Sequence, residues 1–221
     1  MKYSIVLSTT GTRLTLEASV NNFEHFTRTR NDTELIIGTN NPSLEQSWVT
    51  KPSNAKIVCR PDHRVCWSDA IDASSGEFIV NVDDDLKLAT DYLTTADHFF
   101  ADSTLQMIQP TLLDAEGYVC LRKHYRSYTI SVFRRILIEE LGMDYDGRGS
   151  RWPENNIPFV EATWEKASVA VAMNMYAVHY GYPTHHGIDS TIAPYGNRLD
   201  FLEEWRKENN YERISLETIL P

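Results

Sequence analysis

Short apolar runs alternate with longer amphipathic segments through the first hundred residues. Four of these runs have the length and the aliphatic, β-branched content of buried strands: Tyr3–Ser8, Glu34–Thr39, Ala55–Cys59 and Phe78–Val82. Leu14–Arg30 and Val65–Ser74 are spaced as helices. The second strand begins about 30 residues after the first, which is the length of one strand–helix–strand crossover unit. The alternation predicts an α/β fold with many parallel strands, whose first half resembles a nucleotide-binding half-sheet.

The second half of the chain has a less regular pattern. It predicts, in order, a helix, a strand, a strand that turns into a helix, a longer helix closed by Gly181, and a terminal helix, over residues 88–100, 105–109, 128–141, 163–178 and 199–211. Neither an internal repeat nor a low-complexity tract nor a linker interrupts the sequence. We therefore expect a single domain over residues 1–221.

Three consecutive carboxylates, Asp83, Asp84 and Asp85, follow the strand Phe78–Val82 directly. Such a triplet is costly, because the charges repel each other and lose hydration unless a cation lies among them. Mg²⁺ and Mn²⁺ take oxygen ligands and leave positions open for phosphate oxygens. If the strand continues, Asp83 and Asp85 share a face and Asp84 points elsewhere. The alternative is an acidic turn before a helix, with an Asp as N-cap.

The charge balance disfavours a broad nucleic-acid-binding surface. The formal net charge is −10, whereas such a surface needs a basic patch. A local basic cluster is the exception, and a solvated helix face is its favoured interpretation: Arg122, Lys123, Arg126, Arg134 and Arg135.

Cysteine content and hydropathy point to a cytoplasmic protein. The three cysteines have no close pair motif and are expected to be reduced. The N-terminal run is too short for a signal peptide, and no apolar run approaches the roughly 18 residues of a membrane span. We expect a cytoplasmic protein without a membrane span.

Polar residues after the first two strands are candidates for nucleotide contacts. Thr9, Thr10 and Arg13 follow the first strand, where hydroxyls and backbone N–H groups could hold a base or a phosphate. Asn40 follows the second strand on the same edge, although a turn-forming Asn is the alternative. The chain has neither a Gly-x-Gly-x-x-Gly fingerprint nor a Walker lysine.

The far half of the chain supplies a carboxylate and an imidazole pair. Glu161 lies just before a predicted helix, where it could act as a general base or simply compensate the helix dipole; for Glu165, dipole compensation is the favoured interpretation. His185 and His186 could add a metal ligand, and a neutral imidazole suits Mn²⁺ better than Mg²⁺.

Together these motifs resemble the family 2 glycosyltransferases, which are enzymes with the GT-A fold. The resemblance covers roughly residues 3 to 190. It rests on the first strand with Thr9-Thr10, on the helix and turn before the Asp triplet (residues 66–85), on the Arg134-Arg135 helix with its following turn (131–144), and on Glu161 followed by the late histidines.

The resemblance implies a GT-A fold with a Rossmann-like, mostly parallel central sheet flanked by helices and a smaller acceptor-side subregion. It implies a nucleotide-sugar-binding half over residues 1–100, an acceptor half over 101–198 and a C-terminal helix over 199–221. The implied activity is inverting transfer of a sugar from a nucleotide-diphosphate sugar, UDP-linked, to the hydroxyl of a carbohydrate or other acceptor, with Mn²⁺ or Mg²⁺.

The same resemblance implies residue roles. Asp83 and Asp85 would hold the metal, with His185 or His186 as a further ligand. Glu161 would be the catalytic base, with Glu165 and Asp189 in reserve. The nucleotide would contact the residues around the first two strand ends and the triplet: Thr9, Thr10, Arg13, Asn40, Asp83 and Asp84.

Departures from the family pattern keep other functions open. Thr39-Asn40 stands where the family has an acidic residue, and Trp67-Ser68 stands where it has Arg-Asn. The alternatives are a metal-dependent nucleotidyltransferase, a sugar-nucleotide-binding protein without turnover, and a transferase acting on modified DNA bases, to which the negative charge is unfavourable.

Overall fold

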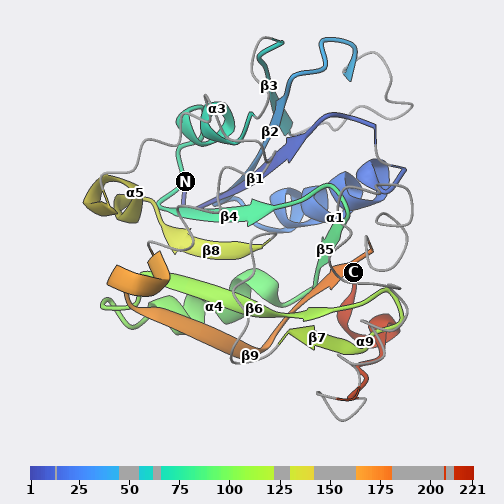
Figure 1. Ribbon diagram of the computed structural model, residues 1–221, viewed down its shortest axis with the longest axis vertical. Helices are drawn as coiled ribbons and strands as arrows, with labels where there is room; N and C mark the ends of the chain where they lie inside the picture. Colours follow the sequence, from blue (N-terminus) through green and yellow to red (C-terminus); the bar gives the residue numbers. More distant parts are fainter. Residues whose placement is uncertain are drawn as a thin grey trace.

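The computed structural model describes residues 1–12, 14–44, 55–61, 66–121, 130–141, 163–180, 207 and 212–221. A nine-stranded mixed sheet forms its centre, in the order β3-β2-β1-β4-β8-β6-β9-β5, with β7 beside β6 (Figure 1). The first-half elements are β1 (Tyr3–Thr9), α1 (Leu16–Thr29), β2 (Thr33–Thr39), β3 (Ala55–Cys59), α3 (Trp67–Asp72) and β4 (Phe78–Val82). The second-half elements are β5 (Leu86–Leu88), α4 (Tyr92–Phe100), β6 (Met107–Leu113), β7 (Val119–Leu121), β8 (Ser131–Arg134), α5 (Ile136–Leu141), β9 (Val169–His179) and α9 (Leu216–Ile219).

The sheet lies between two helical layers, and alternation along the strands assigns each side chain to one layer. Ile5 and Leu7 of β1 face the core that α1 and α4 cover, through Val20, Phe23 and Leu93. The other face packs against α3 and α5 through a second set of buried residues: Val6, Ile36, Trp67, Ile71, Ile79 and Leu137. Strands covered on both faces are expected to be mainly apolar, as β1 and β4 are apart from Ser4, Ser8, Thr9 and Asn81.

The predicted α/β class is confirmed, and so are the strands and helices of the first half. β3 and β4 have the predicted bounds, while β1, β2 and α1 differ from prediction by one or two residues at an end. These four strands are all parallel to one another in the order 3-2-1-4. Apolar runs of this length define themselves clearly because both faces of each strand are buried.

The helix predicted over residues 163–178 is wrong for most of its length. Only residues 163–166 are helical, and Val169–His179 forms β9, which pairs in parallel with β6 on both sides of a register shift. Alanine and methionine favour a helix intrinsically, but pairing with a buried strand outweighs propensities of a few tenths of a kcal/mol per residue. The terminal helix predicted over 199–211 falls outside the described residues except for Lys207.

β6 and β9 pair across an irregularity that the sequence did not predict. The strand expected over 105–109 continues through Pro110 to Leu113. Pro110 is opposite Ala172, yet the next residue, Thr111, is opposite Tyr176. Residues 173–175 therefore leave the ladder, and Met173 and Asn174 are exposed. A proline has no N–H to donate to its neighbour, which makes this a natural place for a bulge.

Among the described helices, none is both long and apolar enough to cross a membrane.

An ion-pair network joins the start of β1 to α1 and α4. The Arg30 guanidinium lies 3.0 Å from Asp32 Oδ2 and 3.0 Å from Asp97 Oδ2, and the Tyr3 hydroxyl donates to Asp97 Oδ1 at 2.8 Å. Hydrogen bonds from Arg30 lower the pKa of Asp32. Burial alone would raise the pKa of Asp97, but hydrogen bonds from Lys2, Tyr3 and Arg30 outweigh it, so the pKa of Asp97 is also lowered.

We predict that this network makes stability fall at acidic pH. A carboxylate whose pKa is lowered by folding stabilises the protein fully above its unfolded pKa of about 4, and this contribution is lost as the pH falls through the folded value. Urea unfolding between pH 7 and pH 3 should therefore show a flatter pH dependence for Asp97→Asn than for the wild type. Asp72→Asn, at an exposed position on α3, should keep the wild-type slope. Equal slopes for Asp97→Asn and wild type would contradict the assignment.

Candidate active site

Strand direction brings separate parts of the chain to one edge of the sheet. β1, β2, β3 and β4 are parallel, so their carboxyl ends lie together. β8 is antiparallel to β4, β6 is antiparallel to β8, and β9 is parallel to β6, so β9 also ends at this edge. Ligands of open α/β sheets bind at such an edge.

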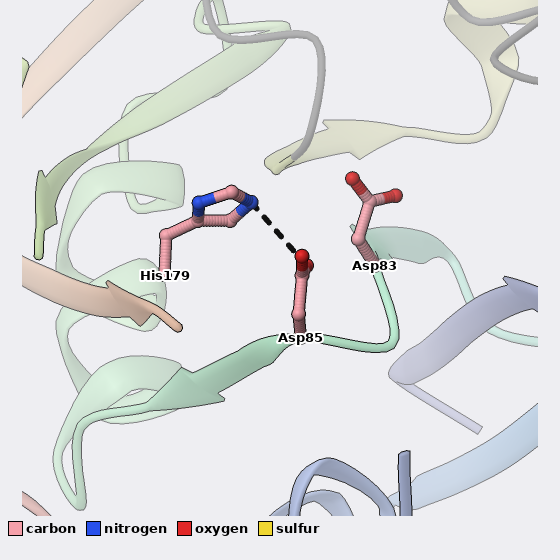
Figure 2. A group of neighbouring side chains, drawn as sticks. All are labelled: Asp83, Asp85 and His179. Atoms are coloured by element: carbon pink, nitrogen blue, oxygen red, sulfur yellow. Dashed lines mark ion pairs between the residues drawn. The ribbon is translucent and has the colours of Figure 1, made fainter. Parts of the chain in front are cut away.

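Asp83, Asp85 and His179 converge there (Figure 2). One ligand atom from each of the three lies within 4.8 Å of the others. The His179 Nε2 atom is 3.3 Å from Asp85 Oδ1, and both side chains are almost completely buried, while Asp83 is half-buried. Two carboxylates and an imidazole, two of them shielded from water, form a group that can hold a divalent cation.

A tight turn, rather than a continued strand, brings the two aspartates together. β4 ends at Val82, Asp84 and Asp85 form a turn, and β5 begins at Leu86. β5 pairs antiparallel with the end of β9, with Leu86 opposite His179, and the Tyr180 N–H donates to the Asp85 carbonyl at 2.7 Å. The short ladder between β5 and β9 thus fixes Asp85 and His179 side by side.

Asp84 is directed toward β1 and α1. Its carboxylate accepts a short hydrogen bond from the Thr9 hydroxyl, and its carbonyl accepts from Thr15 Oγ1 at 3.0 Å and Ser19 Oγ at 3.1 Å. The side chain is only 5% exposed. Asp84 therefore anchors the turn between its two neighbours, in keeping with the expectation that it points elsewhere.

The candidates for nucleotide contacts lie at the same edge, as far as they are described. Thr9 is buried against Asp84, whereas Thr10 is exposed and its hydroxyl is 2.9 Å from that of Thr12. Asn40 is half-buried, and it is the next residue, Asn41, that makes turn hydrogen bonds, to Thr10 O at 3.3 Å and from Ser43 N–H at 3.0 Å.

Several candidates from the sequence fall outside the described residues. They are Arg13, Glu161, His185, His186 and Asp189. Glu165 is described and is exposed on the short helical turn that precedes β9.

His179 is the one member of the group that the sequence analysis did not select. The segment before it was predicted as a helix ending at Val178, which left His179 as a helix terminus without a role. A strand prediction would have placed His179 at a carboxyl end, beside the Asp triplet. The usable signal was Val169 and Val171, which are spaced as in a strand, within an alanine-rich segment.

Trp67, which departs from the family pattern, is part of the core. It is 3% exposed, and its Nε1 donates to Asn81 Oδ1 at 2.5 Å. Asn81 lies on β4 two residues before Asp83. The indole therefore ties α3, within the core, to the strand that leads to the aspartates.

The described part of the basic cluster is committed to the fold. The Arg135 guanidinium donates to the Gly76 and Ile71 carbonyls at 2.7 and 3.2 Å, and Arg134 donates to the Leu105 and Phe100 carbonyls at 2.8 and 3.2 Å. These two arginines fasten loops around β8, which removes them as support for a nucleic-acid-binding surface.

Comparison with solved structures identifies the fold. The chain matches residues 1–349 of S. aureus TarS with a TM-score of 0.61 at 12% identity, over 81% of this chain and 60% of that one. It matches a mannosyltransferase from Pyrobaculum calidifontis, solved with GDP-Man and Mn²⁺, with a TM-score of 0.59 at 13% identity, over 98% of this chain and 66% of that one. It also matches GalNAc-T7, solved with UDP, GalNAc and Mn²⁺, with a TM-score of 0.62 at 15% identity, over 95% of this chain and 55% of that one.

These matches show that the chain has the fold of the GT-A glycosyltransferases, as the sequence predicted. The chain spans about 60% of the length of the TarS fragment and about two thirds of that of the mannosyltransferase. No protein-family model and no curated protein matches the sequence.

The geometry predicts that His179 contributes directly to metal binding. Replacing His179 with Ala should weaken Mn²⁺ binding by about 10-fold or more, since even groups that only orient a ligand contribute 10–100-fold. Isothermal titration calorimetry without any nucleotide measures this. His98→Ala, at an exposed position on α4, is the matched control and should bind as the wild type does. Unchanged affinity in His179→Ala would remove the imidazole from the site.

Proposed function

We propose that this chain is a metal-dependent glycosyltransferase that moves a sugar from a nucleotide-diphosphate sugar, UDP-linked, to an acceptor hydroxyl with inversion. The observation that carries the proposal is the convergence of Asp83, Asp85 and His179 at the carboxyl edge of the sheet. The structures of the mannosyltransferase and of GalNAc-T7, solved with Mn²⁺ and with GDP-Man or UDP, support the same class of chemistry.

The three side chains fit a divalent cation better than a purely structural role. Two carboxylates this close repel each other, and the burial of Asp85 makes its charge expensive in the absence of a cation. Oxygen and imidazole donors together suit Mn²⁺, while Mg²⁺ prefers oxygen alone. A bound ion would supply charge neutralisation for the diphosphate leaving group.

The residues around the triplet would hold the donor. In this proposal Thr9 and Asp84 fix the β1 edge against the aspartate turn, through their hydrogen bond. Thr10, Arg13 and Asn40 would line the nucleotide, with hydroxyl, guanidinium and amide groups available for the base, the ribose or a phosphate. The half-buried Asn40 would leave this edge with an amide where an acidic residue is usual in the family.

The acceptor would be activated by a carboxylate from the segment before β9. Glu161 is the proposed base, which takes the proton from the acceptor hydroxyl as that oxygen attacks the anomeric carbon from the face opposite the leaving group. This role is carried over from the resemblance to the family 2 glycosyltransferases, and residue 161 itself lies outside the described residues. Asp189 and Glu165 are the alternatives for this role, but Glu165 precedes the start of β9 and so lies at the edge of the sheet opposite His179. The acceptor is a carbohydrate or another hydroxyl compound.

We predict metal-dependent turnover of a nucleotide sugar that Asp85→Asn abolishes. The substitution keeps the size of the buried side chain but removes its charge, so the loss should appear in turnover while the fold persists. The measurement is release of free nucleoside diphosphate from a panel of UDP- and GDP-sugars with sugar acceptors and Mn²⁺, with circular dichroism to check folding. Asp72→Asn, on the exposed end of α3, is the control and should keep wild-type turnover.

The products separate the remaining functions. Release of pyrophosphate would identify a nucleotidyltransferase instead, and donor binding without any product would identify a non-catalytic sugar-nucleotide-binding protein. Full turnover by Asp85→Asn would contradict the proposed metal site.

A further inference from the structure

The C-terminal segment, residues 212–221, contacts the strand–turn region that carries Asp85. The carbonyl of Ile219 accepts two hydrogen bonds from one residue, Thr90: from its N–H at 2.7 Å and from its hydroxyl at 3.0 Å. Thr90 follows β5 by two residues and Asp85 by five. The end of the chain is thus linked to the short strand that starts at the aspartate turn.

The same segment also covers the end of β9. Its apolar side chains Ile214, Leu216, Ile219 and Leu220 pack against a small cluster around Val178, together with Tyr176 and Tyr180. Val178 and Tyr180 are the two neighbours of His179. Because successive side chains of a strand point to opposite faces, contact with 178 and 180 holds the strand from the face opposite His179.

Backbone pairing fixes the segment against the β6–β7 turn. Ile214 N–H donates to the Gly117 carbonyl at 2.8 Å, and Val119 N–H donates to the Glu212 carbonyl at 2.9 Å. Gly117 has a φ of +88°, and a Cβ there would lie 2.2 Å from the Ile214 carbonyl oxygen. The turn therefore accepts the C-terminal segment only because residue 117 is a glycine. Figure 1 shows α9, in red, beside β7.

Two of the three members of the candidate metal group are therefore supported by one distant segment. β5, which follows Asp85, and β9, which ends at His179, form only a short ladder with each other, with pairs from Leu86 to Leu88. On the side of α1, the Asn22 side chain holds β5 by accepting from the Leu88 N–H at 2.7 Å and donating to the Leu88 carbonyl at 3.1 Å. On the other side, the chain just after β5 is held at Thr90 by the C-terminal segment. The C-terminal segment contacts β9 and Thr90, two residues after β5, from outside this ladder, and it is itself anchored on a third element, β7.

We infer that the C-terminal segment positions Asp85 and His179 for metal binding, so that its docking sets the affinity of the site. This inference rests on the proposed metal site. The segment contributes no ligand; it acts through Thr90 and Val178, as outer partners of metal ligands do elsewhere. Loosening it should let β5 and β9 separate and weaken metal binding in a protein that is still folded.

The test is Mn²⁺ titration calorimetry on full-length variants without nucleotide. Ile219→Asp places a charge in the apolar contact and should weaken Mn²⁺ binding by about 10-fold or more. Thr90→Val removes one of the two hydrogen bonds at an exposed position, and a smaller loss of roughly threefold is expected. Glu217→Gln, an exposed residue of α9 itself, is the control and should bind as the wild type does.

A second readout reports the strands directly. The Tyr180 N–H, which donates to the Asp85 carbonyl, should exchange with deuterium faster in Ile219→Asp than in the wild type, at a temperature where both are folded. Wild-type affinity in Thr90→Val, or in folded Ile219→Asp, overturns the inference and leaves the metal site standing. Should Ile219→Asp fail to fold, Thr90→Val decides. A wild-type protein that binds no Mn²⁺ overturns the metal site and this inference together.

Discussion

The repulsion between two neighbouring carboxylates that are shielded from water is the constraint on which the rest of the structure depends. Asp83 and Asp85 follow one another with a single residue between them, and Asp85 is 2% exposed. Their mutual repulsion and lost hydration favour any arrangement that spreads them into solvent. The structure opposes this by burying Asp84 against β1 and α1 and by pairing β5 with β9, so that the imidazole of His179 stands at Asp85. The strand order, the turn at Asp84 and Asp85, and strand β9 together place His179 beside Asp85.

The sequence predicted the half of the site that is local in the chain. The Asp triplet is recognisable in the sequence because three consecutive carboxylates after a buried strand have few explanations. The parallel strands that bring Thr9 and Asn40 to the same edge are recognisable from their apolar runs. His179 comes from 94 residues beyond Asp85, so its approach is decided by pairing between β9 and its neighbours. Local propensity in an alanine-rich segment pointed to a helix, and tertiary pairing outweighed it.

The structure also reassigns residues whose type suggested a role in binding. Arg134 and Arg135 donate hydrogen bonds to backbone carbonyls around β8, and Trp67 donates to the buried side-chain amide of Asn81 in β4. Each would have seemed available for a ligand from its type alone. The charge or aromaticity of a residue shows what its side chain could bind. Its actual partner depends on which buried backbone carbonyls and amides lack a hydrogen bond in the folded chain, and the sequence does not reveal this.

The bulge in β9 has a consequence for how this chain can vary. Pairing is regular on both sides of it, with Ala172 opposite Pro110 and Tyr176 opposite Thr111, while Met173 and Asn174 project into solvent between them. A strand normally forbids a change of length, because one added residue would turn every later side chain over. Here an insertion or deletion at 173–174 can be absorbed before the ladder resumes. The pairing that places the His179 side chain would then be unchanged by such a change of length earlier in β9.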